Sequence, residues 1–386
     1  MRERLARVLR GGGAPAPDAD YTDIAEFERE GEAPLAPGAA QRSSAPSLEV
    51  AVVVPWLIEG SGGHSTIANL IRGLEERGHS CSLWVHDPAG RGDGDLAAQV
   101  RDWFGGMDGP VRGGFDEWTG ADVVVATGWQ TVHRTLMLPG ARARAYLVQD
   151  HEAEFSPTSA ESRWADQTYR LGLHCITAGR WLRDLVAQNY GGTASWFELG
   201  VDRTLYAPAD VARDDGTVLF YSRTTTPRRA VPLGLLALAE LRRRRPMVRV
   251  ELFGDPRGAG ALVEHTDLGV LPPAELARAY SRATVGMVLS LTNYSLIAQE
   301  MLACGLPCVE LDTPSTRTAF GEAGPVELAG FGVLSIADAL ERLIADPDLR
   351  AERRKAGLEL VRERTWAAAA EQVEAGLREA LRLVAE

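Results

Sequence analysis

Short apolar runs that alternate with helix-like segments constrain the fold of this chain more than any other feature. The runs form two sets, at residues 48–54, 81–85, 122–126 and 145–148, and at residues 218–222, 248–253, 285–289 and 308–311. Such alternation is typical of parallel sheets whose strands are connected through helices. Between the sets, residues 206–215 contain a proline and a polar tail, which indicates a linker. The sequence therefore predicts an α/β protein with two doubly wound parallel-sheet domains.

Domain boundaries follow from where these sets begin and end. Residues 1–47 are rich in glycine, alanine and proline, so we expect a flexible or docked extension there. We place a first Rossmann-like domain at residues 48–205 and a second one at residues 206–365. The apolar pattern of residues 366–386 predicts a final helix.

Composition limits the classes of function. The 386 residues carry a formal net charge of −12, with 45% hydrophobic and 24% charged residues. This mixture is typical of a globular protein, and the negative charge argues against a general nucleic-acid binder. No apolar run approaches the ~20 residues of a membrane span, and the first residues lack the apolar segment of a secretory signal. We therefore expect a cytoplasmic protein, with peripheral membrane contact and the oligomeric state left open.

Neither the cysteines nor the acidic pairs predict a metal site. The four cysteines form no Cys-x-x-Cys pair and no zinc-like cluster with histidine, so we interpret them as buried thiols. Asp-x-Asp strings occur at residues 18–20, 93–95 and 346–348. None of them directly follows an apolar strand, where such a string could hold a metal ion. We therefore expect no metal and no other cofactor.

A strand–turn–helix pattern in the second set is the most informative stretch for function. The apolar run at 285–289 leads into a polar turn, and a helical pattern then covers 295–303 until a Gly-x-Pro sequence stops it. The free backbone N–H groups of such a helix start can hold an anion. Glu300 follows Ser295 by ~7.5 Å along the helix axis, where it could meet the ribose of a nucleotide. An ordinary βα unit with a solvent-facing Glu300 is the alternative.

This stretch resembles the donor-site signature of glycosyltransferase family 4, in which a Glu-x7-Glu pair precedes an Ala-Cys-Gly-x-Pro turn. Glu300 matches the second glutamate, and residues 303–307 match the turn. Thr292 replaces the first glutamate, and in this respect the chain resembles the WsaF-type rhamnosyltransferases of the family. Further strings that resemble these proteins lie at residues 146–152, 177–182 and 199–202.

The resemblance covers roughly residues 120–370, and it implies both a fold and a reaction. The fold is GT-B, in which an acceptor-side domain and a donor-side domain face a central cleft and the final helix packs back on the first domain. The donor would be a nucleoside-diphosphate sugar, with dTDP-L-rhamnose favoured. The acceptor would be a hydroxyl group of a glycan, a glycolipid or a small molecule.

Basic residues between a strand and a helix of the second domain match the family's diphosphate site. Arg223 and Arg228 have the spacing of the Arg and Lys that family members use. Arginine can neutralise a departing diphosphate through bidentate hydrogen bonds, so no metal ion is required. A solvated basic turn is the alternative, and Asp255 either binds the donor or caps the next turn. The donor-binding residues that the resemblance implies are Arg223, Arg228, Asp255, Leu271, Asn293, Tyr294, Ser295, Leu296 and Glu300, of which the two arginines are also catalytic.

Loops of the first domain are expected to bind the acceptor. Gly62 and Gly63 match a Gly-Gly pair of the family, whereas Ser65 interrupts the Gly-x-Gly-x-x-Gly pattern of dinucleotide sites. Asp150 or His151, at a strand end, would take the acceptor proton in an inverting transfer; in a retaining transfer the leaving phosphate would take it. A capped strand end is the alternative. The expected acceptor-binding residues are Gly62, Gly63, His64, Trp129, Asp150, His151 and Glu152.

The sequence and the resemblance together predict a metal-independent glycosyltransferase of polysaccharide biosynthesis. Two alternatives stay open. A sugar-nucleotide epimerase with the GT-B fold would consume the donor without any acceptor. A non-catalytic homologue that acts as an auxiliary subunit is favoured by the missing glutamate at Thr292. A Ser-His-Asp hydrolase is not supported, because the sequence has no Gly-x-Ser-x-Gly elbow.

Overall fold

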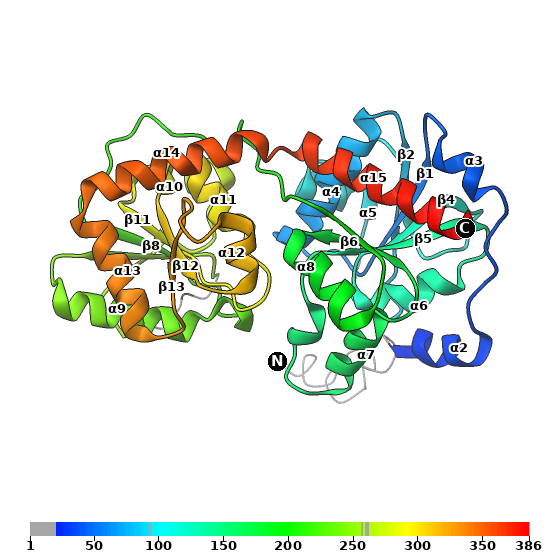
Figure 1. Ribbon diagram of the computed structural model, residues 1–386, viewed down its shortest axis with the longest axis horizontal. Coiled ribbons are helices and arrows are strands. Elements are labelled where there is room, and N and C mark those ends of the chain that lie inside the picture. The colour runs from blue at the N-terminus through cyan, green and yellow to red at the C-terminus, as the bar shows by residue number, and fades with distance from the viewer. Residues whose placement is uncertain (1–20, 93, 256–257, 259–261, 386) are drawn as a thin grey trace, which may run out of the picture. The chain divides into compact units, whose positions relative to one another are not determined.

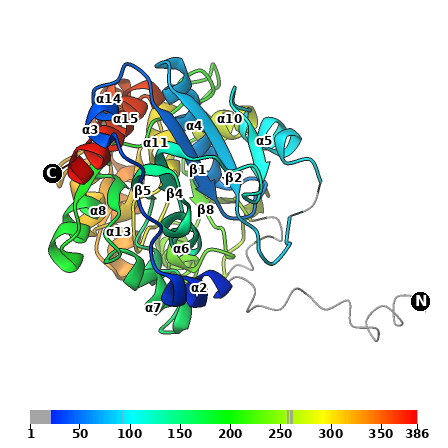
Figure 2. The same ribbon diagram turned by 90° about the vertical axis from the view of Figure 1, so that its right-hand side faces the viewer.

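The structure, a computed structural model, describes residues 21–92, 94–255, 258 and 262–385. By its internal contacts the described chain divides into two compact units (Figure 1 and Figure 2). The first unit comprises the residues up to Thr177, Val186–Ser195 and the residues from Ala370 onward. The second unit comprises Ala178–Leu185 and Trp196–Ala369. Each unit is built around its own parallel sheet.

The sheet of the first unit has seven strands. In chain order they are β1 (Glu49–Val54), β2 (Ser80–Val85), β3 (Val111–Gly113), β4 (Ala121–Ala126), β5 (Ala141–Val148), β6 (His174–Ala178) and β7 (Ala194–Phe197). Their spatial order is β3-β2-β1-β4-β5-β6-β7. The chain therefore moves outward from β1 to β3 and then returns to place β4 on the other side of β1. The direction of winding reverses between β1 and β4.

Helices connect the strands of this sheet. They are α4 (Gly62–Glu76), α5 (Leu96–Phe104), α6 (Trp129–Met137), the 3-10 turn η2 (Glu152–Glu154), α7 (Ala160–Thr168) and the π-helical turn η3 (Val186–Tyr190). Helix α4 begins where the side chain of Ser61 accepts a hydrogen bond from the backbone N–H of His64. Its apolar face, which includes Ile67, Leu70 and Leu74, is buried.

The central strands consist mostly of apolar residues because both faces of the sheet are covered. Every residue of β4 is buried, and so are the last five residues of β1. Strands that are buried on both faces read as continuous apolar runs rather than as alternating patterns. This is why the runs at 48–54 and 122–126 predict strands at these places.

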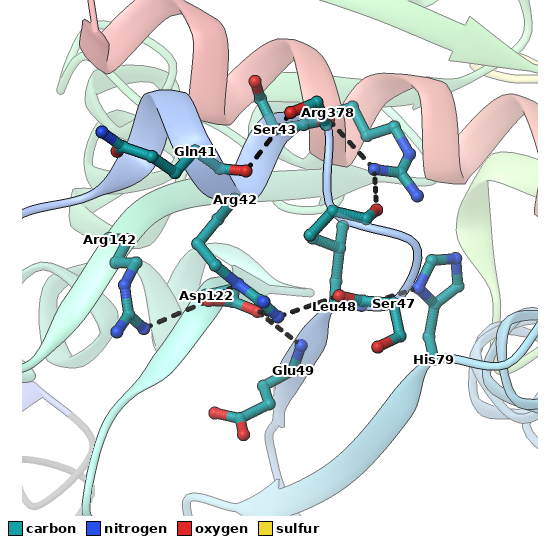
Figure 3. Close-up of polar contacts among 12 residues, drawn as sticks. Gln41, Arg42, Ser43, Ser47, Leu48, Glu49, His79, Asp122, Arg142 and Arg378 are labelled. Carbon is teal, nitrogen blue, oxygen red and sulfur yellow. Dashed lines mark hydrogen bonds and ion pairs between the residues drawn. The ribbon is translucent and has the colours of Figure 1, made fainter.

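Two helices that precede the sheet, α2 (Thr22–Glu30) and α3 (Ala39–Ser43), pack on the first unit. Asp122 of β4, which is 1% exposed, receives hydrogen bonds from Arg42 of α3, from Arg142 and from the backbone N–H of Glu49 (Figure 3). A buried carboxylate is stable only when it is paired in this way. The first part of the expected extension, residues 1–20, lies outside the described residues.

The helix α15 (Trp366–Ala385) contributes its residues from Ala370 onward to the first unit. Val373, Leu377 and Leu381 form a buried stripe at helical spacing. Glu374 forms an ion pair of 2.5 Å with Arg77, and Arg378 donates hydrogen bonds to the backbone carbonyls at the end of α3 (Figure 3). The packing of the last helix on the first unit thus has both apolar and ionic contacts.

The sheet of the second unit has six strands and the same kind of winding. In chain order they are β8 (Thr217–Tyr221), β9 (Arg249–Phe253), β10 (Thr266–Asp267), β11 (Val285–Met287), β12 (Cys308–Leu311) and β13 (Glu327–Ala329). Their spatial order is β10-β9-β8-β11-β12-β13. The chain moves outward from β8 to β10 and then returns to place β11 beside β8, so the winding reverses between β8 and β11.

Helices cover both faces of this second sheet (Figure 1). The helices between and after its strands are the 3-10 turn η4 (Pro227–Arg229), α9 (Val231–Arg244), α10 (Pro273–Arg282), α11 (Leu296–Ala303), α12 (Pro314–Phe320), α13 (Val333–Ala345) and α14 (Pro347–Glu363). The helix α8 (Arg180–Leu185), which connects β6 to β7, belongs to this unit by its contacts, among them those with α12. In Figure 1, α9 and α13 lie below the sheet, and α10, α11 and α14 lie above it. The close approach of α11 requires a glycine in β11, since a Cβ atom at Gly286 would lie 2.5 Å from the sulfur of Met301.

The structure confirms the predicted fold class, because each unit is an α/β layer structure around a parallel sheet. The four cysteines are buried and unbridged, as their apolar surroundings predict. Among the described residues, no helix combines the length and the apolar character that crossing a bilayer requires.

Candidate functional site

The loops that follow β8 and β11 meet at the place where the winding of the second sheet reverses. In open α/β sheets, ligands bind beyond the carboxyl ends of the strands at such a reversal. The loop after β8 carries Arg223 and Arg228, and the loop after β11 leads into the start of α11. Both arginine side chains are partly exposed. The structure therefore brings two predicted donor elements to one edge of the sheet.

Hydrogen bonds connect these two loops directly. The backbone N–H of Leu291 donates to the carbonyl of Arg228 at 3.0 Å, and Nη1 of Arg229 donates to Oγ of Ser290 at 2.6 Å. Ser290 in turn donates from its N–H and its hydroxyl to Glu310, at 2.6 and 2.9 Å. Glu310 is fully buried, and this burial raises its pKa to about 7 although Arg229 lies near it. The contacts of Arg228 and Arg229 with residues 290–291 thus fix the arginine loop to the helix-start loop.

Asp255 holds the other side of the arginine loop. It follows β9, is 1% exposed, and accepts hydrogen bonds from the backbone N–H of Thr224, at 2.8 Å, and from the Thr224 hydroxyl. Asp255 thus supports the arginine loop, and its predicted contact with the donor stays a prediction. Gly254 donates to the carbonyl of Gly269 at 2.8 Å, so the segment that leads to half-buried Leu271 lies beside the same loop.

The start of α11 differs in one detail from the expected anion site. The backbone N–H of Tyr294 is already paired, with Oδ1 of Asn293 at 3.0 Å and with Oγ of Ser315 at 2.9 Å. Asn293 itself is buried and donates from its side chain to the carbonyl of Ala178. The N–H groups of Ser295 and Leu296 have no hydrogen-bond acceptor within the described residues. The amides that can receive an anion are therefore those two, at the first turn of the helix.

Glu300 is buried in α11, so the alternative of a solvent-facing carboxylate is wrong. Its side chain is 7% exposed and accepts a hydrogen bond of 3.3 Å from the hydroxyl of Tyr280. Tyr206 donates to it as well. Burial raises the pKa of Glu300 to about 8, because removing a carboxylate from water disfavours its charged form. The predicted contact with a ribose stays a prediction.

The first unit has a pocket of about 260 Å³ at the carboxyl ends of its central strands. Trp56 follows β1, Trp129 follows β4, and Glu152 with Phe155 follows β5. Because β1 and β4 are the strands between which the winding reverses, this pocket also occupies the position where open sheets bind ligands. Of the expected acceptor residues, the structure places Trp129 and Glu152 in its wall.

Buried hydrogen bonds fix Glu152 in this wall. Its Oε2 accepts from the backbone N–H of Trp129 at 2.8 Å, and its Oε1 accepts from the hydroxyl of Tyr146 at 3.0 Å. The backbone N–H of Glu152 donates a hydrogen bond of 3.0 Å to the hydroxyl oxygen of Tyr169. The carboxylate therefore has a single orientation at the end of β5.

Asp150 and His151 are buried beside Glu152 but outside the residues that line this pocket. Oδ1 of Asp150 accepts from the backbone N–H of His151 at 2.9 Å. Nε2 of His151 lies 2.7 Å from the hydroxyl of Tyr190, which donates to Asp166 at 2.8 Å. Since that hydroxyl gives its proton to Asp166, it accepts from His151, and Nε2 carries the proton.

Gly62, Gly63 and His64 form the first turn of α4, and they are not among the residues that line the pocket. The side-chain amide of Gln149 donates to the carbonyl of Gly63 at 3.2 Å. His64 packs on Phe104 with 5.5 Å between ring centroids, and burial lowers its pKa to about 4. Both of its ring nitrogens are buried and have no hydrogen-bond partner within the described residues.

Sequence reasoning missed several residues at these two places. Trp56 comes two residues after the end of an apolar strand, a position that could have marked it. Tyr21, which also lines the pocket, had no such signal because its helix lies before the sheet. Arg229 and Glu310 became visible only when the structure placed them on either side of Ser290.

Comparisons with known proteins agree on one family. Residues 216–319 match the family model for the C-terminal domain of WsaF. The chain is 33% identical over 262 residues to the O-antigen biosynthesis protein RfbC of Myxococcus xanthus. The aligned residues cover 66% of this chain and 20% of that protein. It is 33% identical over 211 residues to a D-inositol 3-phosphate glycosyltransferase of Frankia alni. This alignment covers 47% of this chain and 52% of that protein. The match thus spans a fifth of the first relative and about half of the second.

Solved structures share the fold. Anabaena HepE, solved in complex with UDP-glucose, superposes with a TM-score of 0.63 over 87% of this chain and 100% of that chain. The two sequences are 13% identical, so this likeness concerns the arrangement of helices and strands alone.

Proposed function

We propose that this chain, which belongs to the GT-B glycosyltransferases of family 4, transfers a sugar from a nucleoside-diphosphate donor to an acceptor hydroxyl. The donor we favour is dTDP-L-rhamnose, because residues 216–319 match the model of the WsaF C-terminal domain. With Thr292 in place of the first glutamate, the chain also resembles WsaF-type rhamnosyltransferases. The acceptor is a hydroxyl of a glycan, a glycolipid or a small molecule. HepE, which has the same fold, was solved with a donor of the same chemical class, UDP-glucose.

One observation carries the proposal: the arginine loop after β8 and the helix-start loop after β11 are hydrogen-bonded to each other at the reversal of the sheet. A leaving diphosphate gains negative charge as the glycosidic bond breaks. Arg223 and Arg228 offer guanidinium groups that keep their charge, and α11 offers the positive end of its dipole. Together these groups supply the electrostatic stabilisation that the leaving group needs.

The remaining roles follow from the same placement. Asp255 and Glu310 hold the arginine loop through Thr224 and Ser290, so the guanidinium groups need little reorganisation when the donor binds. In this proposal the arginines replace a divalent metal ion. Asp150 or His151 takes the acceptor proton if the product has inverted configuration, and the leaving phosphate takes it if configuration is retained.

A thermal-shift panel with dTDP, UDP, GDP and ADP tests the donor site. A ligand at a hundredfold excess over its Kd stabilises the folded state by ~2.7 kcal/mol, which raises Tm by roughly 5–11 °C for a unit of this size. We expect one of the four to produce this shift with the wild type and with the control Arg278→Ala, whose side chain is exposed on α10. We expect Arg228→Ala to lose the shift and the transferase activity.

Two results would contradict the proposal. One is a panel in which no nucleotide raises Tm, and the other is an Arg228→Ala variant that binds as tightly as the wild type. Thr292 favours one further candidate, a non-catalytic homologue that binds a nucleotide without turning it over. Proton NMR of the protein with the sugar nucleotide of the responding base and a mixture of acceptor glycosides separates them, since only the enzyme releases the nucleoside diphosphate. Loss of the donor without any acceptor would instead indicate an epimerase.

A further inference from the structure

We infer that the pocket of the first unit is a binding site for one pyranose ring of a carbohydrate, and that Tyr21, from the segment ahead of the sheet, forms one of its walls. The inference rests on the proposed function in one respect: the bound ring would belong to the acceptor. The site itself follows from the residues around the pocket and needs no assumption about the donor.

The size and place of the pocket fit one ring. Its volume of about 260 Å³ lies just below the ~300–1,000 Å³ that are typical of sites for drug-sized ligands. Its floor is the carboxyl edge of β1, β4 and β5, at the reversal of winding in this sheet. A ligand there is reached by loops from four strands, since Arg91 comes from the loop after β2.

Aromatic side chains make up much of the wall. The rings of Tyr21 and Trp129 are stacked, with centroids 6.2 Å apart and an angle of 17° between their planes. Trp56 also lines the pocket, and the guanidinium carbon of Arg91 lies 3.9 Å from its ring centroid. Phe155 is 38% exposed beside them. The negative faces of such rings attract the weakly positive C–H groups on the apolar face of a sugar.

The polar groups of the pocket match the hydroxyls of a sugar. Glu152 and Glu161 line it, and an ionised carboxylate only accepts hydrogen bonds, as an array of sugar O–H donors requires. Each Glu152 oxygen accepts a hydrogen bond from the protein, which fixes the orientation of the carboxylate in the wall. Hydrogen bonds from its own backbone N–H, from Ser159 and from Tyr21 lower the pKa of Glu161, so it is ionised at neutral pH.

The helix α2 holds Tyr21 in this wall. Figure 1 and Figure 2 both show α2 beside α6 and α7. Asp23, 2% exposed, is paired with His86 and Arg134, and Arg134 also contacts Glu26 at 2.8 Å. A buried carboxylate that is hydrogen-bonded to two side chains of the sheet unit specifies one docked position, because moving α2 would leave the carboxylate without these partners.

The hydroxyl of Tyr21 adds a second fixed point. It donates to Oε1 of Glu161 at 3.0 Å, and the ring also contacts Trp164, with centroids 4.8 Å apart. Helix α2 thus places an aromatic face and orients a carboxylate in the same wall. The arrangement has the two elements that carbohydrate recognition uses: a flat apolar surface and fixed hydrogen-bond acceptors at its edge.

Saturation-transfer difference NMR on the full chain tests this site with a panel of methyl glycosides of glucose, galactose, mannose, rhamnose and N-acetylglucosamine. We expect at least one to receive saturation at its ring protons from the wild type. The signal should fall at least fivefold in Tyr21→Ala and be largely kept in Tyr21→Phe, which retains the ring. Phe331→Ala, which removes an exposed aromatic side chain from the second unit, is the matched control and should keep the full signal.

Two outcomes would overturn the inference: no glycoside is saturated by the wild type, or Tyr21→Ala transfers saturation as well as the wild type does. Thermal melting of each variant shows that the unit is still folded. The nucleotide thermal shift, measured on the same samples, keeps the two proposals separate. A nucleotide shift without glycoside binding would remove this site and leave the donor site standing, and the reverse result would remove the donor proposal alone.

Discussion

The substitution Glu300→Gln should remove a pH dependence from the stability of the second unit. Glu300 is 7% exposed, accepts hydrogen bonds from Tyr280 and Tyr206, and has a pKa raised to about 8 by burial. At neutral pH the folded protein therefore keeps a proton on this group, whereas the unfolded chain releases it above its ordinary pKa of 4.5. Since the unfolded state binds fewer protons, stability falls as the pH rises from 4.5 towards 8.

The size of this effect follows from the two pKa values. Each pH unit between them costs ~1.4 kcal/mol, and integration from pH 5 to pH 8 gives a loss of roughly 3–4 kcal/mol for this one carboxyl group. For a unit of this size that corresponds to a fall in Tm of roughly 6–16 °C. Glutamine has the shape of the protonated side chain and no proton to release, so the variant should lack this part of the slope.

Differential scanning calorimetry at pH 5, 6, 7 and 8 measures the effect and can resolve the transitions of the two units. Glu310, also buried, has a pKa raised to about 7 and contributes its own slope in both proteins, so the difference between them isolates Glu300. The control Glu275→Gln changes an exposed carboxylate on α10 and should follow the wild type. Profiles of the wild type and Glu300→Gln that run parallel within ~1 kcal/mol would refute the reasoning.

Two further substitutions test how the donor loops are built. Asp255→Ala should weaken binding of the nucleotide that responds in the thermal-shift panel by about tenfold. Thr224 loses both of its hydrogen bonds to Asp255, at a cost of ~1–3 kcal/mol, and the arginine loop is then held less firmly. Isothermal titration measures the Kd, and an unchanged value would contradict this prediction. Gly286→Ala should lower the free energy of unfolding of the second unit by ~1–3 kcal/mol, because the new methyl group would lie 2.5 Å from the sulfur of Met301. Urea unfolding measures this free energy, and a value equal to that of the wild type would show that Met301 and α11 adjust without cost.

The strands were predictable because burial on both faces leaves a direct record in the sequence. The runs at 122–126 and 285–289 mark β4 and β11, although β11 ends two residues earlier than the apolar run, at Met287. The loops after β8 and β11 were also predictable. Parallel strands of one sheet end at the same edge, so the sequence places Arg223, Arg228 and the start of α11 at one edge of the second sheet. That β8 and β11 are neighbours, which brings the two loops into contact, is shown only by the structure.

The environment of individual side chains was not predictable in the same way. A helical period shows that α11 has a buried face, but the partners that bury Glu300 come from Tyr206 and Tyr280, on segments whose approach the period does not encode. The pair between Asp23 and Arg134 joins residues 111 positions apart. Such long-range pairings depend on how elements dock, and a single sequence gives no local signal for them.

The division of residues between the units bears on how the protein is made. Gly376 lies so close to Ile176 that a Cβ atom there would come within 2.9 Å, and Arg378 satisfies the carbonyls of Ser43 and Ala45. Until the residues from Ala370 onward leave the ribosome, the unit that is synthesised first lacks this cover. A nascent chain that has completed β1–β7 and the second sheet still exposes the apolar surface beside β6. Exposed apolar surface of this kind makes incompletely folded domains prone to aggregate. Of the two units, the one whose strands are translated earlier is therefore completed later, and removal of the residues from Ala370 onward should destabilise this first unit.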